Sequence, residues 1–469
     1  MKSQICSAVL VFVFAFAFPG LAGSQRASQS EDSPPVSTFK TLYNFCPDGS
    51  ICADGETPYG GLVRDNAGNL YGTTYSGGAF GEGAVFKLDP SGHETVLYSF
   101  CRLSGCTDGS RPRASVIRDA MGNLYGTTTQ GGMGGEGAIF KLDTHGTETV
   151  LYSFCFISSC VDGATPDGSL LRDSSGDLYG TTFSGGLHGS GTIFEISAPG
   201  VETVLYSFCS VGVGLCTDGS HPAAALTRDA AGNFYGTTVD GGNKYGTVFE
   251  LDASGHESVL YTFCPQPPSC LDGRGPNGTL IRDATGNLYG TTVNGGSGGV
   301  GVVFQINPAN QERVLHNFKG SPSDGALPED ALIEDSSGNF YGTTFEGGAI
   351  NWGTVFKLTK TGKETILVNF GQNHNGGFPY ASVIRDASGN LYGTTTAGGT
   401  HSLGTVFELP SSSISSSSIP QAILGHEATD EATYGKIETT EENRRSFKNF
   451  PWIPASLGRL QNHQIHSHW

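Results

Sequence analysis

The sequence predicts an all-β protein, a seven-bladed β-propeller of four-stranded antiparallel blades closed by its N-terminal strand on the last blade. Three observations predict this fold: a unit of about 54 residues occurs seven times, each copy carries four strand-like segments, and the two ends of the array are permuted. Each unit is centred on Leu/Phe-Tyr-Gly-Thr-Thr, and the tyrosines of this core are Tyr71, Tyr125, Tyr179, Tyr235, Tyr289, Tyr341 and Tyr392. Units with such a period bury their apolar faces on their neighbours.

The second copy illustrates the four strands of a unit, which we expect at residues 114–118, 124–128, 138–142 and 148–154. A tight turn at Asp119 to Asn123 joins the first two strands, and the Gly-rich loop 131–137 joins the second and third. In a four-stranded meander the tight turns lie on one face of the ring. The Gly-rich loops and the connections between units lie on the other face, where the sequence varies most.

The ends of the array predict that the ring is closed. The last copy ends after its third strand at Leu409, without a fourth strand. The segment Phe39 to Cys46 matches Glu94 to Cys101, which is the fourth strand of the first copy. Pairing this N-terminal strand with the last unit would remove the exposed sheet edges of an open stack.

The N-terminus has the pattern of a bacterial export signal, with Lys2, an apolar run from Ala8 to Phe18, and small residues from Ala22 to Ser24. The apolar run is shorter than the roughly 20 residues of a membrane-spanning helix, so we expect a secreted or cell-surface protein with no membrane span after cleavage. The predicted organisation is a signal peptide (1–24), a short linker (25–36), the propeller (37–410), and a Ser-rich linker with a disordered tail (411–469).

The composition argues against nucleic acid as a partner. The chain has 26 Lys and Arg against 44 Asp and Glu, a net charge of −18, which repels nucleic acid and anionic lipid. We expect a monomer, with an extracellular polysaccharide or protein as its partner.

The cysteines predict disulfides. Cys6 leaves with the signal peptide, and ten cysteines remain as five local pairs, each followed one residue later by Asp-Gly. The two copies that lack the motif lose both cysteines together, as a disulfide within one loop requires. Two thiolates without further ligands make a metal site the weaker alternative. The pairs are Cys46/Cys52, Cys101/Cys106, Cys155/Cys160, Cys209/Cys216 and Cys264/Cys270.

The blocks Leu-Tyr-Gly-Thr-Thr, Gly-Gly, Gly-Thr-Val-Phe and Leu-Tyr-Ser-Phe resemble the bacterial GloVer tandem repeat of choice-of-anchor proteins, and the resemblance covers all seven copies. It implies an exported or surface-displayed repeat protein. Members of that family differ in their C-terminal sorting signals, and nothing after Pro410 has the form of an apolar anchor followed by basic residues. The units also resemble general propeller repeats, which implies that the strand after Pro58 lines the central channel.

Two repeated acidic features have simple structural explanations. An Arg-Asp pair precedes the first turn in six copies, and Glu334-Asp335 replaces it in the sixth. We expect the Asp to cap its own turn and the Arg to bridge blades. The Asp of each Asp-Gly could contribute to a Ca²⁺ site, but no Asp-x-Asp-x-Asp spacing supports this, so turn formation is preferred.

A binding site should break the sevenfold pattern, since one ligand needs residues that only one or two blades supply. The candidate ligand-binding residues on the variable face are Tyr59, Arg113, His188, Lys244, Tyr245, Glu329, Trp352, Tyr380 and His401. No catalytic triad, metal motif or phosphate loop joins these residues, and the sequence predicts no cofactor. Scattered surface variation would also explain why these residues differ between the copies.

The preferred hypothesis is an exported, non-enzymatic binding scaffold for an extracellular polymer or protein. One alternative is a secreted carbohydrate-active enzyme, a hydrolase or lyase, that uses carboxylates such as Glu82 and Glu329. Another is a structural component of the cell envelope. In the tail, His463, His466 and His468 lie close enough to bind a metal weakly.

Overall fold

The computed structural model describes residues 39–415 except 48, 50, 51, 157, 199, 213, 373 and 374. The chain divides into two units, residues 1–416 and 417–469, and all described residues belong to the first. The predicted signal peptide, the first linker and the tail beyond residue 415 lie outside the described residues.

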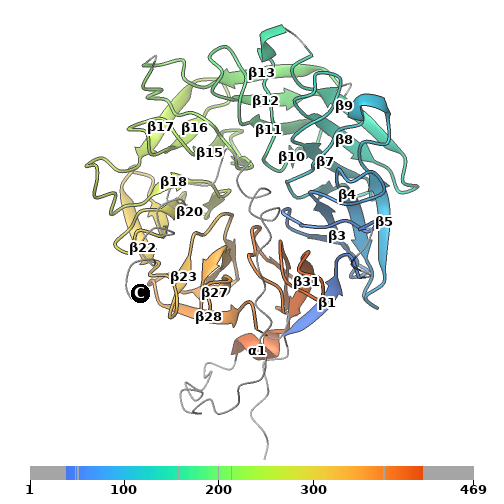
Figure 1. Ribbon diagram of the computed structural model, residues 1–469. Helices are drawn as coiled ribbons and strands as arrows, with labels where there is room; N and C mark the ends of the chain where they lie inside the picture. Colours follow the sequence, from blue (N-terminus) through green and yellow to red (C-terminus); the bar gives the residue numbers. More distant parts are fainter. Residues whose placement is uncertain are drawn as a thin grey trace, which may run out of the picture. The chain divides into compact units, whose positions relative to one another are not determined.

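The described part is a β-propeller, with seven sheets of four antiparallel strands set around a central axis (Figure 1). Blade 1 holds β2 (Val63–Arg64), β3 (Leu70–Thr74), β4 (Ala84–Leu88) and β5 (Glu94–Ser99). Blade 2 holds β6 (Ile117–Arg118), β7 (Leu124–Thr128), β8 (Ala138–Leu142) and β9 (Glu148–Ser153). Blade 3 holds β10 (Leu171–Arg172), β11 (Leu178–Thr182), β12 (Thr192–Ile196) and β13 (Glu202–Ser207). Blade 4 holds β14 (Thr227–Arg228), β15 (Phe234–Thr238), β16 (Thr247–Leu251) and β17 (Glu257–Thr262).

The later blades carry small additions to this plan. Blade 5 holds β19 (Ile281–Arg282), β20 (Leu288–Asn294), β21 (Val302–Ile306) and β22 (Glu312–Asn317), and β18 (Arg274–Pro276) also pairs with β20. Blade 6 holds β24 (Ile333–Glu334), β25 (Phe340–Thr344), β27 (Thr354–Leu358) and β28 (Glu364–Asn369). A separate two-stranded sheet joins β23 (Gly325–Ala326) to β26 (Glu346–Gly347).

The N-terminal strand closes the ring as predicted. Blade 7 is formed by β29 (Ile384–Arg385), β30 (Leu391–Thr395), β31 (Thr405–Leu409) and β1 (Lys40–Asn44), in that order from the axis outward. Strand β1 is antiparallel to β31, and Lys40 pairs with Glu408 through a 3.1 Å ion pair. The permuted ends of the sequence therefore meet in one sheet.

Helices are few and short. The 3₁₀ helices η1 (Ser104–Cys106) and η2 (Ser158–Cys160) lie in two cysteine loops, and α1 (Ser411–Ser415) follows the last strand. The stretch predicted as the start of a flexible linker thus begins as a helical turn, because Ile414 packs against the core of blades 6 and 7. Among the described residues, no helix combines the length and the apolar character needed to span a bilayer.

The Gly of the repeated core makes room for the Phe of the neighbouring strand. In blade 1, a methyl group added to Gly72 would lie 2.7 Å from the Phe86 ring, too close for any side chain. Phe86 is fully buried, and Phe45 of the N-terminal strand segment packs edge-on against it, 5.1 Å between ring centroids. The same cluster includes Tyr392 of blade 7, so the ring closes over apolar core.

The first Thr of the core joins neighbouring blades. Thr73 donates a 2.9 Å hydrogen bond to the carbonyl of Ala114 in the next blade, and the series ends with Thr394 donating to Gly60 across the closure at 3.1 Å. The Ala114 carbonyl therefore accepts a hydrogen bond from the neighbouring blade and is not paired with a strand of its own sheet. For this reason the innermost strand β6 is only two residues long, shorter than the predicted 114–118.

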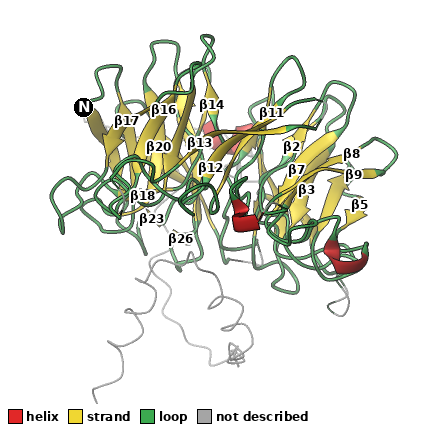
Figure 2. Ribbon diagram, turned by 90° about the horizontal axis from the view of Figure 1, so that it is seen from above, coloured by secondary structure: helices red, strands yellow, loops and turns green. Residues whose placement is uncertain are grey.

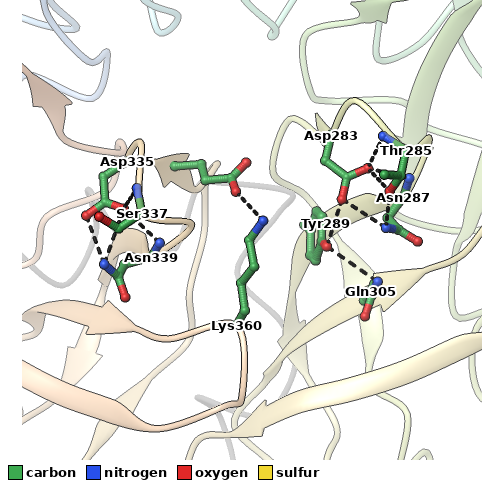
Figure 3. A network of polar contacts seen from close by, with 10 residues as sticks. Asp283, Thr285, Asn287, Tyr289, Gln305, Asp335, Ser337, Asn339 and Lys360 are labelled. Carbon is green, nitrogen blue, oxygen red and sulfur yellow. Dashed lines mark hydrogen bonds and ion pairs between the residues drawn. The ribbon is translucent and has the colours of Figure 1, made fainter.

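The Asp of each Arg-Asp pair caps its own turn, as predicted. The carboxylate of Asp283 accepts hydrogen bonds from the backbone N–H groups of Thr285 and Asn287, both 2.9 Å, and from the hydroxyl of Tyr289 at 3.1 Å (Figure 3). The Arg bridges blades: Arg228 lies 3.3 Å from Asp173 of the preceding blade.

In the sixth copy, Glu334 takes the place of that Arg. Lys360 compensates for the reversed charge through a 2.8 Å ion pair with Glu334. Figure 3 shows Lys360 between the two neighbouring turns of blades 5 and 6. The opposite charges are thus paired within blade 6, whereas Arg228 pairs with the preceding blade.

Disulfides join all five predicted cysteine pairs, and the alternative of a metal site at two thiolates is not needed. Each bridge closes a loop between the fourth strand of one blade and the innermost strand of the next. The bonds are Cys46–Cys52, Cys101–Cys106, Cys155–Cys160, Cys209–Cys216 and Cys264–Cys270.

The second cysteine of each pair also holds the neighbouring Gly-rich loop. Its carbonyl accepts a hydrogen bond from the N–H of a Gly in that loop, at 2.8 or 2.9 Å in every case. The five contacts are Gly78 to Cys52, Gly132 to Cys106, Gly186 to Cys160, Gly242 to Cys216 and Gly296 to Cys270. The two loop types therefore share one face of the ring, which we call the variable-loop face. Figure 2 shows the strands running between this face, marked by β18, β23 and β26, and the opposite face of tight turns.

Candidate functional site

A proline precedes each innermost strand, and the residue after this proline lines the central channel. The residue preceding the repeated proline has a left-handed conformation in all seven copies, with φ between 54° and 64°. Six of these residues are not Gly, and such a conformation is uncommon for them. Their N–H groups are held by carbonyls in the Gly-rich loop of the preceding blade, as in Arg111 to Glu82 at 2.8 Å. The residues are Thr57, Arg111, Thr165, His221, Gly275, Leu327 and Phe378.

The residue after each proline lines one cavity on the axis. Seven blades contribute to this ring, and the side chains differ at almost every position. The members are Tyr59, Arg113, Asp167, Ala223, Asn277, Glu329 and Tyr380. Four of the predicted ligand-binding residues, namely Tyr59, Arg113, Glu329 and Tyr380, are thus brought together.

Arg113 is the centre of the channel cluster. Its Nη1 atom lies 2.7 Å from Asp167 Oδ2, and its Nη2 atom donates a 2.6 Å hydrogen bond to the hydroxyl of Tyr380. The guanidinium carbon lies 4.9 Å from the centre of the Tyr380 ring and 5.5 Å from that of Tyr59. The side chains of Arg113 and Asp167 are only 11% and 10% exposed, so this is a buried ion pair.

A second set of contacts completes the ring. Asn277 donates to Glu329 Oε2 at 3.3 Å and to the Tyr380 hydroxyl at 3.4 Å. The ring of Tyr59 meets that of Tyr380 edge-on, 5.1 Å between centroids. Side chains from several blades therefore form one polar and aromatic network.

The cavity between these side chains is small, about 60 Å³. Two polar atoms at its wall, Arg113 Nε and Asp167 Oδ1, are buried without a hydrogen-bond partner among the described residues. A volume of this size holds a few water molecules, whereas sites for small organic ligands usually have at least about 300 Å³. This cavity is therefore suited to water or a small ion, and it is smaller than the usual site for a sugar.

Burial governs the acidity of the channel groups. It raises the pKa of Glu329 to about 7, although the charge of Arg113 opposes the rise. It also raises the pKa of Asp167, again against Arg113, and that of Asp330. Burial by itself would lower the pKa of Arg113, but the neighbouring Asp167 raises it above its usual value, so the guanidinium stays charged. Burial thus favours the protonated form of all three channel carboxyl groups.

The other predicted ligand-binding residues lie in the Gly-rich loops and not in the channel. His188, Lys244 and His401 are exposed there, whereas Tyr245 and Trp352 are partly buried against the blade cores. Trp352 stacks on Phe378 with 5.3 Å between ring centroids.

Two further groups of sequence candidates serve the scaffold. Glu82, a candidate catalytic carboxylate, forms a 3.1 Å ion pair with Arg111 and so serves a contact between blades. The ten disulfide cysteines lie in the connections between blades, and none of them lines the cavity. Their role is to hold the loops of the variable-loop face.

The sequence analysis overlooked Asp330, which also lines the cavity and accepts a 2.9 Å hydrogen bond from the N–H of Ser382 in the next blade. Its position holds Gly or Ala in the other six copies. A carboxylate among small residues was the signal that could have identified it.

Comparison with known proteins assigns the family. The Gloeobacter/Verrucomicrobia repeat matches residues 31–244, 105–281 and 222–440, which together span most of the chain. The chain belongs to the Gloeobacter/Verrucomicrobia repeat family. This confirms the family resemblance that the repeated blocks indicate. No curated protein matches this Gloeobacter/Verrucomicrobia repeat protein.

Solved structures similar to this Gloeobacter/Verrucomicrobia repeat protein are distant from it. The extracellular domain of a one-component system from B. thetaiotaomicron is 11% identical with a TM-score of 0.49, and the match covers 78% of this chain and 39% of that one. A candidate 6-phosphogluconolactonase from Bacteroides uniformis is 17% identical with a TM-score of 0.41, covering 65% and 82%. A candidate gluconolactonase is 14% identical with a TM-score of 0.36, covering 58% and 80%.

Proposed function

We propose that this protein is an exported, non-enzymatic scaffold that binds a protein partner on its variable-loop face. The observation that carries the proposal is the distribution of exposed apolar side chains. Eleven large hydrophobic residues are exposed in the described part of the chain, and nine of them lie in the Gly-rich or cysteine loops. These nine are Phe80, Leu103, Met133, Phe156, Leu187, Val211, Leu215, Leu271 and Ile350.

Most of the nine residues come from the loops of four consecutive blades. Eight of them lie between residues 80 and 271, in the loops of blades 1 to 4 and the connections that follow them. The corresponding tips of the Gly-rich loops in blades 4 and 7 carry exposed Lys244 and His401. Exposed apolar groups that gather in this way mark interaction surfaces, because leaving them in water is unfavourable.

The chemistry of these side chains favours a protein over a polysaccharide. Seven of the nine are aliphatic or Met, and only Phe80 and Phe156 are aromatic. Aliphatic side chains and Met suit the apolar centre of a protein interface. A polysaccharide presents mainly hydroxyl groups, which would be left without hydrogen-bond partners against such a surface.

The disulfides support an extracellular location. Five of them are formed between pairs of nearby cysteines. Disulfides persist in oxidising compartments and are rare in the cytosol. Together with the export signal predicted at residues 1–24, they support a binding role outside the cytoplasm.

One observation favours an enzyme as the second candidate. Glu329 has a pKa of about 7, a value suited to proton transfer at neutral pH, and Tyr380 and Arg113 lie in the same cavity. The cavity of about 60 Å³ argues against a polymer substrate there. Turnover of cell-wall polysaccharides by the wild-type protein and its loss in Glu329→Gln would establish this alternative.

The binding proposal is tested with two matched variants. Phe156→Ser with Leu187→Ser removes apolar groups that are 65% and 72% exposed on the variable-loop face. Met121→Ser with Val201→Ser removes groups that are 74% and 62% exposed and lie in tight turns on the opposite face. Each purified protein is cross-linked to the surface proteins of the producing cells, and the captured proteins are identified.

We expect the wild type and the Met121/Val201 variant to capture the same protein, and the Phe156/Leu187 variant to lose it. Equal capture by all three proteins would exclude the variable-loop face. Binding to purified glycans on an array, retained without any protein partner, would replace the proposed protein ligand with a polysaccharide.

A further inference from the structure

The connection between blades 5 and 6 differs from the five connections that carry a disulfide. In those five, a Tyr on the fourth strand donates its hydroxyl to the Asp of Asp-Gly, as Tyr261 does to Asp272 at 2.9 Å. Before blade 6 the Tyr is replaced by His316, and the loop has no cysteines. The Asp of this loop, Asp324, is kept.

His316, Asp324 and Glu364 converge at this connection. One donor atom from each lies within 4.8 Å of the others, and His316 Nε2 lies 3.3 Å from Asp324 Oδ2. Two tetrahedral ligands at Zn²⁺–N and Zn²⁺–O distances near 2.0–2.1 Å would be about 3.3 Å apart. The histidine and aspartate are therefore already at the separation of two ligands of one ion.

Two of the three residues, His316 and Glu364, offer donor atoms without a hydrogen-bond partner among the described residues. His316 Nε2 and Glu364 Oε1 are both buried and form no hydrogen bond with a described residue, since the approach of His316 to Asp324 is not in hydrogen-bond geometry. Asp324 is held in place by the N–H groups of Lys319, at 3.0 Å, and Gly325, at 2.7 Å. The His316 ring is fixed by edge-on packing against Phe318, 4.8 Å between centroids.

The charges at the cluster suit a divalent cation. Its two carboxyl groups can supply up to two negative charges, which an ion such as Zn²⁺ would neutralise. Lys319 brings a positive charge to the same loop, but its side chain is exposed and stays hydrated. An imidazole with two carboxylates suits Zn²⁺ and similar transition metals, whereas Ca²⁺ and Mg²⁺ prefer oxygen ligands alone.

We propose that His316, Asp324 and Glu364 bind a Zn²⁺ ion that clips blade 5 to blade 6 where the disulfide of the other connections is missing. His316 lies on β22 of blade 5, Asp324 ends the connecting loop, and Glu364 begins β28 of blade 6. The ion closes the loop between residues 316 and 324 and ties it to the next blade. Water occupies the fourth ligand position.

The test uses the full-length oxidised protein, stripped of metal by a chelator and titrated with Zn²⁺ in a calorimeter. The decisive variant is His316→Tyr, because it installs the side chain that the disulfide-bearing connections carry, where the Tyr hydroxyl donates a hydrogen bond to the Asp. We expect the wild type to bind Zn²⁺ at this site and to show a higher melting temperature with it. His316→Tyr should lose both effects while keeping the circular dichroism spectrum of the metal-free wild type.

Two further variants separate this site from other ligands. Tyr261→His places an imidazole beside Asp272 and Glu312 and should add a second equivalent of bound Zn²⁺. The wild type and His316→Tyr are also compared in a background carrying His463→Ala, His466→Ala and His468→Ala, which removes the tail histidines. If His316→Tyr binds as much Zn²⁺ as the wild type in that background, or if neither binds any, the proposal is wrong.

Discussion

Single side chains give the channel its character, because the backbone presents the same position seven times and only the side chain differs. Arg113, Asp167, Glu329 and Tyr380 stand where blade 4 has Ala223. Arg113 and Asp167 form a buried ion pair, so neither charge is left without a partner, which would lower the stability of the folded protein. The network is thus set by residues that break the repeat.

Removing one member of this pair should be strongly destabilising. Arg113→Met leaves Asp167 buried without its cation, and we expect a loss of about 3–5 kcal/mol, measured as a lower midpoint of thermal or urea unfolding at pH 8. The loss should be smaller at pH 5, where Asp167 can take up a proton. The control is Arg113→Met with Asp167→Ala, which matches the Ala of blade 4; if the double variant is as unstable as the single one, the ion pair is not the cause.

Glutamates at the start of the fourth strands form a second set of titrating residues. In blade 2, Glu148 Oε1 is buried without a hydrogen-bond partner among the described residues, and burial together with the charge of Asp108 raises the pKa of Glu148 to about 7. In blade 7 the corresponding positions hold Phe39 and Asn375, so both carboxyl groups are lost together. The equivalent glutamates, all with a pKa raised to about 7, are Glu94, Glu148, Glu202, Glu257, Glu312 and Glu364.

These glutamates should make stability depend on pH. A carboxyl whose pKa is higher in the folded than in the unfolded chain favours folding when it is protonated, so its contribution is present below about pH 4.5 and is lost as the pH rises through about 7. We therefore expect the melting temperature to fall between pH 5 and pH 8. Glu148→Gln, which stays neutral, should raise the melting temperature at pH 8 and change it little at pH 5; the opposite order would contradict the assigned pKa shift.

The cysteine loops are the elements that most distinguish the variable-loop face. The paired cysteines are only five to seven positions apart, and each bridge follows a fourth strand. The second cysteine of each pair accepts a hydrogen bond from the neighbouring Gly-rich loop. The two connections without cysteines depend on other contacts. In the one before blade 7, Asn375 donates to the carbonyl of Asn369 at 3.1 Å.

Removing a disulfide should destabilise the propeller moderately. On the chain-entropy estimate, closing so short a loop contributes roughly 2 kcal/mol. Cys101→Ser with Cys106→Ser should therefore lower the melting temperature, and adding a reductant should lower that of the wild type further because five loops open. A melting temperature that does not change on reduction would contradict a stabilising role.

Closure of the ring is a property of the whole propeller. Strand β1 is the outermost strand of blade 7, although Lys40 and its partner Glu408 on β31 are 368 positions apart. The hydrogen bond between Thr394 and Gly60 spans the same junction, as does the apolar cluster that contains Phe45. Because β1 completes the sheet of blade 7 whichever end of the chain supplies it, the position of the chain ends within the ring should matter little.

A circular permutant tests this closure. Moving residues 39–46 to follow Leu409, joined by a turn copied from Asp143 to Thr147, places the fourth strand of blade 7 in the order of the other blades. We expect the permutant to fold with the circular dichroism spectrum of the wild type. A deletion of residues 39–46 without the transfer exposes the edge of β31 and should aggregate; a monomeric and equally stable deletion variant would show that β1 is dispensable.

Sequence analysis was enough to predict the blade, the number of blades, the ring closure, the disulfide pairs and the two loop faces. These follow from local patterns: strand-forming segments, turn residues such as Asp119 to Asn123, and cysteines a few residues apart. It also marked Tyr59, Arg113, Glu329 and Tyr380 as exceptions to the repeat. It could not predict that Arg113 binds Asp167 and Tyr380, nor separate these residues from His188 or His401.

Those relationships arise in the folded ring, because it brings Arg113 together with residues that are 54 and 267 positions away in the chain. Burial also depends on the ring, and burial raises the pKa of Glu329 and leaves donor atoms such as His316 Nε2 without partners among the described residues. The cluster of His316, Asp324 and Glu364 was missed for the same reason: a Tyr-to-His change in one copy becomes informative only when the facing carboxylates are in place.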